Sequence, residues 1–344
     1  MNTSNSTDGI ILLAKKSGLT SFTSLNSVKK ALGTSKVGHT GTLDSFAQGL
    51  LVVCTGRLTR LAGNITEFDK AYDAVIKFGQ ETDTLEYTGN IIKESPLPSK
   101  EALERAVEAY TGPIMQKPPA FSAIHVNGQR ASDLARNGSI TDLPARPVTI
   151  YKAEIKEVRL NKDSKVEYAL IHFLVSKGTY IRSLARDIAA ECNTSAHLVG
   201  LYRTKVGHFS IENAAGFYQL EAFTIDSAIK TSLKKEDINS QKDCKKDWSL
   251  DKSEIDLKDE IRSKILALDE DTAQLCGFDI IHTKDQKAIS DFKNGKALRS
   301  ANFDTDLHTL QNKKSVGVFT QDGSFIGLIY KDESGKVSYK FVIN

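Results

Sequence analysis

The pattern of apolar and polar positions predicts a mixed α/β region from residue 9 to about residue 219. Three runs alternate between apolar and polar residues, as half-buried strands do, and these are 72–78, 148–160 and 168–175. Three other runs have apolar residues near helical spacing, and these are 22–32, 99–110 and 182–192. Ser21 is the candidate N-cap of the first predicted helix, and Gly33 follows its end. We expect 148–160 and 168–175 to be neighbouring strands.

The chain changes character twice after residue 219. Residues 231–266 hold nine basic and nine acidic side chains and few large apolar ones, which predicts a solvated linker or a surface helix. Beyond Ala267, strand-like runs flank the turn Asp322-Gly323, a strong hairpin signal, and a second turn at 333–335 leads to 337–342. The predicted division is a flexible arm (1–8), a main domain (9–219), a charged linker or insertion (220–266) and a small β-rich domain (267–344).

Composition narrows the class of protein. The chain has 344 residues, 40% of them hydrophobic and 26% charged, which is typical of about two globular domains. It contains no apolar run of the ~18 residues that a membrane span needs, and its polar start does not resemble a secretory signal. The four cysteines form no CxxC pair, which argues against a zinc ribbon or a disulfide framework and favours the cytoplasm. A net charge of +3 permits a nucleic-acid partner without requiring one.

The densest group of chemically useful residues lies in 37–61, VGHTGTLDSFAQGLLVVCTGRLTRL. Glycines surround His39 and Asp44 there, and glycine lets a backbone approach a ligand closely. Two interpretations of Asp44 stay open from spacing alone: a partly desolvated, reactive carboxylate, or the N-cap of a helix that begins near Phe46. The segment has neither the GKS/GKT of a P-loop nor a GxGxxG, so a phosphate cradle is poorly supported.

GHTGTLD and the segment that follows it resemble the catalytic region of the TruB-type tRNA pseudouridine synthases of the bacterial, stand-alone kind. Further matches recur in the family's order, and SKGTYIRSL at 176–184 is nearly identical to the family's motif. The matching segments are 9–21, 38–44, 49–61, 70–72, 79–84, 116–123, 135–138, 145–148, 176–184 and 196–203. Chance is a poor explanation for this many matches in one order.

The resemblance implies an isomerase that converts uridine 55 in the T-loop of tRNA to pseudouridine, with no metal and no cofactor. The implied fold is α+β, with a mixed, mainly antiparallel sheet in the catalytic domain and a small β-rich, PUA-like domain at the C-terminus. The expected partner is the T-arm of tRNA, and the expected state is a cytoplasmic monomer without membrane contact. Two alternative interpretations stay open: the chain is an RNA-binding or tRNA-folding protein on the same fold, or it is a guide-RNA-dependent synthase of the dyskerin type.

The resemblance also implies roles for individual residues. Asp44 matches the essential aspartate, which breaking an N-glycosidic bond needs as a nucleophile or a base, and Arg182 matches the arginine that pairs with it. Tyr72 matches the tyrosine that stacks on the flipped uracil, and an aromatic face suits any base. Tyr180 matches a second active-site tyrosine, and on an extended segment it would share a face with Arg182.

Four further residues are implied to bind substrate. Leu201 matches a leucine that lines the pocket, and His39 matches a histidine that takes the place of the everted base. Glu86 falls where many members carry an acidic residue, and Arg60 falls where the family usually has lysine. Candidate phosphate contacts are Lys36, Arg57, Arg60, Lys117, Arg130, Arg136 and Arg203. The chain departs from the family pattern at Ser45, which replaces a proline and could loosen the loop that carries Asp44, and at Lys16, His125 and Ser132.

Overall fold

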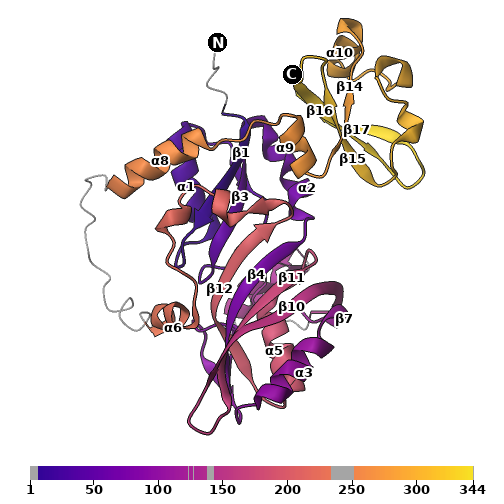
Figure 1. The fold of residues 1–344 in the computed structure, drawn as a ribbon. Coiled ribbons are helices and arrows are strands. Elements are labelled where there is room, and N and C mark those ends of the chain that lie inside the picture. Colours follow the sequence, from indigo (N-terminus) through magenta and orange to yellow (C-terminus); the bar gives the residue numbers. More distant parts are fainter. Residues whose placement is uncertain (1–6, 123, 127, 138–142, 234–251, 344) are drawn as a thin grey trace.

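The computed structural model describes residues 7–122, 124–126, 128–137, 143–233 and 252–343. Within these residues, a nine-stranded sheet forms the centre of the main domain (Figure 1). Its order is β1 (Gly9–Lys15), β3 (Gln48–Thr55), β12 (Ala196–Val206), β4 (Lys70–Phe78), β11 (Val166–Val175), β10 (Arg146–Leu160) and β7 (Gly112–Gln116), with β2 (Val37–His39) paired to β3 and β13 (Phe209–Ser210) to β12. Neighbours run antiparallel except β3 and β12, which pair in parallel. The predicted α+β architecture with a mainly antiparallel sheet is confirmed.

The three strands predicted from alternation are present as β4, β11 and β10, and the last two are antiparallel neighbours as expected. β4 lies inside the sheet and is buried on both faces. Tyr72, Ala74, Ile76 and Phe78 point into a cluster beneath the helices α3 (Lys100–Ala109) and α5 (Ile181–Glu191), whereas Val75 packs on the other face against α6 (Ile225–Leu233).

The shorter elements of the main domain are α2 (Ala62–Thr66), β5 (Gln80–Thr82), β6 (Ile91–Glu94), β8 (His125–Val126), β9 (Gln129–Arg130), α4 (Ala131–Arg136) and the 3₁₀ turns η1 (Gly56–Leu61), η2 (Ile211–Asn213) and η3 (Phe217–Gln219).

The predicted helices are present, but the first has a different cap. In α1 (Ser21–Leu32) the Thr23 N–H donates to the Thr20 hydroxyl at 3.0 Å, so Thr20 is the N-cap and the prediction of Ser21 is wrong. Both residues have a hydroxyl suited to capping, and the Ser21 hydroxyl is engaged elsewhere, by the loop that carries Asp44. In α3 the N-cap is Ser99, whose hydroxyl accepts from the Ala102 N–H at 3.2 Å.

The charged stretch contains a surface helix, which is one of the two predicted outcomes. α8 (Lys252–Ser263) packs along α1, and Leu257, Ile261 and Ile265 join the apolar cluster of that helix. Arg262 Nε donates to the Ala31 carbonyl at 2.8 Å, so α8 also caps the C-terminal end of α1. Residues 234–251 of this stretch lie outside the described residues.

A smaller sheet follows at the C-terminus, in the order β14 (Asp279–His282), β15 (Lys314–Phe319), β16 (Phe325–Lys331) and β17 (Val337–Val342). The hairpin predicted around Asp322-Gly323 is confirmed, as is the strand at 337–342. The helices α9 (Glu270–Leu275) and α10 (Gln286–Lys293) and the turns η4 (Ser300–Asn302) and η5 (Leu307–Thr309) complete this region. Figure 1 shows the small sheet beside one end of the large one, near α9 and α2. No helix in the described part of the chain is long and apolar enough to cross a membrane.

Candidate active site

Asp44 lies where two open cavities meet. The first, of about 490 Å³, is lined by Asp44, Tyr72, Tyr180, Arg182 and Leu201 among others, and we call it the tyrosine cavity. The second, of about 680 Å³, is lined by Asp44, Arg182, His39 and Glu86 among others, and we call it the histidine cavity. The structure therefore brings together seven of the eight site residues that the sequence predicts, drawn from positions 39 to 201.

Arg182 holds Asp44 in place. Its Nε donates to Asp44 Oδ2 at 3.0 Å and its Nη2 to Oδ1 at 3.3 Å, a two-point contact that fixes the plane of the carboxylate. The arginine side chain is 7% exposed and that of the aspartate 37%, so the carboxylate still faces the cavities. Nη1 and Nη2 also donate to the carbonyls of Thr84 and Phe121, both at 2.9 Å.

Arg182 reaches this position from the first turn of α5. The expectation that Tyr180 and Arg182 share a face of an extended segment is wrong, because the helix begins at Ile181. Tyr180 precedes the helix in an extended conformation as its N-cap. The start of α5 therefore fixes the direction of both side chains.

The loop that carries Asp44 is fixed by hydrogen bonds from distant residues. Segment 15–21 supplies most of them: Lys15 Nζ donates to the Ala47 carbonyl at 2.6 Å, Ser17 Oγ to Phe46 at 2.8 Å, and the Gly18 N–H to Ser45 at 2.8 Å. Ser21 bonds twice with Leu43, accepting from its N–H at 2.8 Å and donating to its carbonyl at 2.9 Å. These bonds hold the loop even though Ser45 stands where the family has proline.

Arg203 closes the other side of this loop. It is 3% exposed and donates to the carbonyls of Gly41, Thr42 and Leu50 at 3.2, 3.3 and 2.8 Å. A buried guanidinium with these partners is structural, so its interpretation as a phosphate contact is wrong.

The other candidate phosphate contacts differ in their surroundings. Lys36, Lys117 and Arg136 are exposed, Arg57 pairs with Asp8, and the Arg130 side chain lies outside what the structure describes.

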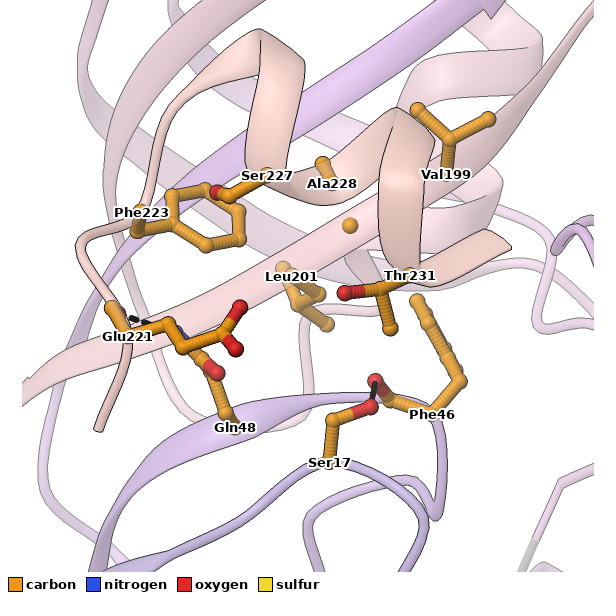
Figure 2. A pocket seen from close by; sticks show the side chains of 11 residues that line it. Ser17, Phe46, Gln48, Val199, Leu201, Glu221, Phe223, Ser227, Ala228 and Thr231 are labelled. Atoms are coloured by element: carbon orange, nitrogen blue, oxygen red, sulfur yellow. Dashed lines mark hydrogen bonds between the residues drawn. The ribbon is translucent and has the colours of Figure 1, made fainter. Parts of the chain in front are cut away.

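The alternative interpretation of Asp44 as a helix cap is wrong. No helix begins near Phe46 in this described segment, where the chain turns and enters β3 at Gln48. Figure 2 shows the rear of the turn, with the Ser17 hydroxyl bonded to the Phe46 carbonyl and Leu201 close by. The gap behind the loop is about 30 Å³, room for about one water, so the ligand-sized space lies on the Asp44 side.

Buried or half-buried polar groups line the tyrosine cavity. Tyr72 is 8% exposed, and burial raises the pKa of the Tyr180 phenol, with Asp44 adding to the effect. Lys70, which sequence reasoning did not single out, also lines this cavity, and its Nζ donates to the carbonyls of Thr66 and Phe68. Burial, with Arg203 adding to it, lowers the pKa of Lys70 to about 8. The Lys70 amine therefore loses its charge at a lower pH than an exposed lysine does.

His39 and Glu86 lie in the histidine cavity. Burial lowers the pKa of His39, and nearby Arg203 adds to the effect, so the ring is neutral at pH 7. Glu86 accepts a hydrogen bond from the Thr88 hydroxyl. The same cavity is lined by Phe22, an exposed aromatic in α1 that sequence reasoning missed. Its helical position gave no sign that it would lie beside Asp44.

Arg60 lies outside both cavities. Its Nη1 donates to the Val342 carbonyl at 3.0 Å, and its guanidinium lies 6.0 Å from the centre of the Phe341 ring. It therefore contacts the C-terminal sheet, and its role in RNA binding stays a prediction.

Within the described residues, no group of three or more His, Cys, Asp or Glu side chains could hold a metal ion.

Comparison with known proteins finds relatives in one family. Residues 29–181 match the family described as TruB family pseudouridylate synthase (N terminal domain). A tRNA pseudouridine synthase B from Treponema denticola is 41% identical over 342 residues, covering 93% of this chain and 94% of that protein. A protein of the same name from Borreliella burgdorferi is 41% identical over 208 residues, covering 60% of this chain and 72% of its own length.

Solved structures share the fold. The Cbf5-Nop10-Gar1 complex contains a chain that superposes with a TM-score of 0.64 over 98% of this chain and 85% of its own, at 21% identity. An H/ACA RNP bound to a substrate RNA containing 2′-deoxyuridine gives a TM-score of 0.60 over 95% of this chain and 79% of that one, at 19% identity. The fold and the relatives thus define a pseudouridine synthase, an enzyme of the isomerase class. The chain belongs to the TruB family of pseudouridylate synthases.

Proposed function

We propose that this protein converts uridine 55 in the T-loop of tRNA to pseudouridine, with Asp44 as the reacting carboxylate. The observation that carries the proposal is the accessible Asp44 carboxylate, held at two points by a buried Arg182 beside a cavity lined by two tyrosines. The relatives at 41% identity are named tRNA pseudouridine synthase B, which supports tRNA as the substrate.

The site suits a base that has left its stack. A uridine inside a folded loop must be everted, which costs about a few kcal/mol of stacking and pairing. Tyr72 offers a ring face to the everted uracil, and Leu201 supplies an apolar wall. His39, neutral and in the neighbouring cavity, would occupy the space that the base leaves. The base would then be detached at its N-glycosidic bond and rejoined through carbon 5, with Asp44 acting as nucleophile or as base. Carbon 5 gives up its proton and N1 gains one, so the product is an isomer of uridine.

The test is Asp44→Asn, assayed for pseudouridine in a T-arm hairpin and in whole tRNA. Asparagine keeps the shape but neither attacks nor takes a proton, so the rate should fall by at least about a thousandfold. RNA affinity should change little. Asp163→Asn, in the surface turn between β10 and β11, is the matched control and should behave as wild type. Conversion at a near wild-type rate by Asp44→Asn would show that another group does the chemistry.

The two alternative functions differ in what the purified protein does alone. An RNA-folding protein would bind tRNA and leave uridine unchanged, and a guide-RNA-dependent synthase would require added RNA and protein partners. We expect the chain alone, without cofactor, to modify one uridine in tRNA, which mass-based mapping detects. The division at residues 219 and 267, RNA contact by the PUA-like domain, the monomeric state and the cytoplasmic location remain part of the proposal.

A further inference from the structure

Gln116, the last residue of β7, is bonded at both ends of its amide to one residue of the candidate site. Its Nε2 donates to the Tyr180 carbonyl at 3.1 Å, and its Oε1 accepts from the Tyr180 N–H at 2.8 Å. The side chain is 2% exposed. A buried amide that bonds through both its donor and its acceptor to the backbone of one residue fixes that residue in position and orientation.

The stretch after Gln116 is attached to the same end of α5. Arg182 Nη2 donates to the Phe121 carbonyl at 2.9 Å, and Arg186 Nη2 donates to the Lys117 carbonyl at 3.1 Å. Segment 116–121 is therefore bonded at three residues, 116, 117 and 121, to Tyr180 and the N-terminal half of α5. We call this segment the strap. It links the edge strand β7 to Tyr180 and to Arg182, the residue that holds Asp44.

The Tyr180 backbone needs such support. Tyr180 lies one residue before α5 begins, with φ −100° and ψ 109°, and no side-chain bond of its own caps the helix. The preceding turn contains Gly178 at φ 77°, a conformation in which glycine is conformationally permissive. The Tyr180 carbonyl accepts the first helical bond, from the Leu184 N–H, but its own N–H lies outside the helix. In the described structure, Gln116 supplies the acceptor for that N–H.

We propose that Gln116 is a positioning residue for catalysis, which holds Tyr180 against the tyrosine cavity. The inference rests on the proposed function, because it assigns Gln116 to the same site. Glutamine is suited to the task because it offers a donor and an acceptor at fixed spacing. Glutamate keeps only the acceptor when ionised, and methionine keeps neither while filling a similar volume.

The experiment measures single-turnover pseudouridine formation and RNA affinity separately, on a T-arm hairpin. In Gln116→Met the rate should fall by about tenfold to a hundredfold, because a displacement of about 1 Å at a reacting group costs that much. The dissociation constant should stay within about threefold, since the strap does not have to touch the RNA for this effect. Gln80→Met is the matched control, because the Gln80 amide donates to Glu94 at an exposed site, and it should match wild type.

A double-variant cycle with Tyr180→Phe separates positioning from general stability. If Gln116 acts through the Tyr180 phenol, adding Gln116→Met to Tyr180→Phe should lower the rate much less than it does in the wild type. Fully additive losses, or a wild-type rate in Gln116→Met, would overturn the inference. Gln116→Asn, which keeps an amide donor and acceptor on a shorter side chain, should fall between wild type and Gln116→Met and serves if the methionine variant does not fold.

Hydrogen exchange keeps the inference distinct from the proposed function. Peptides that cover 178–184 should exchange faster in Gln116→Met than in wild type, and unchanged exchange would count against the inference whether or not the protein modifies RNA. If the wild type converts no uridine in any tRNA, the proposed function fails. If the wild type is active and Gln116→Met is equally active, the inference alone fails.

Discussion

At the scale of single residues, the site depends on one guanidinium shared among three segments. Arg182 bonds to Asp44, to the Thr84 carbonyl and to the Phe121 carbonyl. Lysine could not make these contacts, because it lacks the planar fork that reaches several acceptors at once. The residue that orients the carboxylate thus also holds two backbone segments around it, so chemistry and local structure are coupled at this position.

Tyr180 leads to a prediction about pH. Burial raises the pKa of its phenol above the usual value of about 10. A raised pKa means that the proton is lost later as pH increases, so the phenol stays protonated across the neutral and mildly alkaline range. We therefore expect the ratio of wild-type to Tyr180→Phe single-turnover rates to stay constant between about pH 6.5 and about pH 9.

That ratio also cancels the titration of groups common to both proteins, such as Lys70, whose pKa is lowered to about 8. A ratio that falls toward one above about pH 8 would show that the phenol loses a functional proton there. The measurement is the rate of pseudouridine formation at saturating enzyme, with hairpin folding checked at each pH.

At the scale of elements, the loop that carries Asp44 and segment 15–21 behave as one unit. Lys15 is 1% exposed and bonds to the Ala47 carbonyl, and burial lowers its pKa to about 7, with the attraction of Asp44 opposing that shift. Because the folded pKa lies below the unfolded one, this group favours folding more as pH rises above about 7. A buried lysine at this point marks how closely the two segments are packed.

Ser21 tests whether this packing matters for catalysis. Ser21→Ala leaves the Leu43 N–H and carbonyl without the hydroxyl that serves both, in a place where both residues are 3% exposed. Unsatisfied buried groups should lower the free energy of unfolding by about 1–3 kcal/mol. The rate should also fall, since Leu43 precedes Asp44. Urea unfolding and single-turnover kinetics measure the two effects.

Ser24→Ala is the control for this prediction. Ser24 is also buried in α1, but among the described residues its hydroxyl bonds only to the Thr20 carbonyl, at the start of the same helix. We expect a small loss of stability and a wild-type rate. Equal effects of the two substitutions would mean that the Ser21 hydroxyl has no special role in holding the loop.

The sequence predicted some elements well because their cause is local. Alternation identified β4, and the Asp322-Gly323 turn identified the C-terminal hairpin, since each pattern is complete within a few residues. At α1 the residues Thr20 and Ser21 both offered a capping hydroxyl, and the choice between them depended on Leu43, 22 positions from Ser21. The helix that one of the two interpretations of Asp44 placed near Phe46 is absent for the same reason, because bonds from segment 15–21 and Arg203 hold this segment as a turn.

The candidate site could be predicted as a set of residues but not as a geometry. Asp44, Tyr72, Tyr180 and Arg182 follow from motif resemblance, because the chemistry constrains residue type. Gln116, Lys70 and Arg203 also lie in matching segments, but the resemblance gave no role to Gln116 or Lys70 and a wrong one to Arg203. Their contacts exist only when β7, β4 and β12 lie beside the loop and α5. Contacts between segments 60 to 160 positions apart cannot be read from spacing along the chain.

At the scale of the whole molecule, the small sheet is joined to the catalytic part through a shared apolar cluster. Leu61 and Ile65 meet Phe278 of the α9–β14 connection and Phe319 and Leu328 of the C-terminal sheet. Asn64 Nδ2 adds a hydrogen bond to the Ser315 hydroxyl at 3.0 Å. Removing the C-terminal residues would expose this cluster, so a point variant is a cleaner test of the joint than a truncation.

Arg60 provides that test, because two roles predict different results. If Arg60 connects the catalytic part to the C-terminal sheet, Arg60→Gln should lose the bond to the Val342 carbonyl and lower the melting temperature. The salt dependence of tRNA binding should then be unchanged. If Arg60 is a phosphate contact, Arg60→Gln should reduce the slope of log affinity against log salt by about 1. The present contacts favour the first result. Arg136→Gln, at an exposed residue that lines both cavities, is the comparison and should show the reduced slope. A reduced slope in both variants would place Arg60 in the RNA interface, and with it the edge of the C-terminal sheet that it contacts.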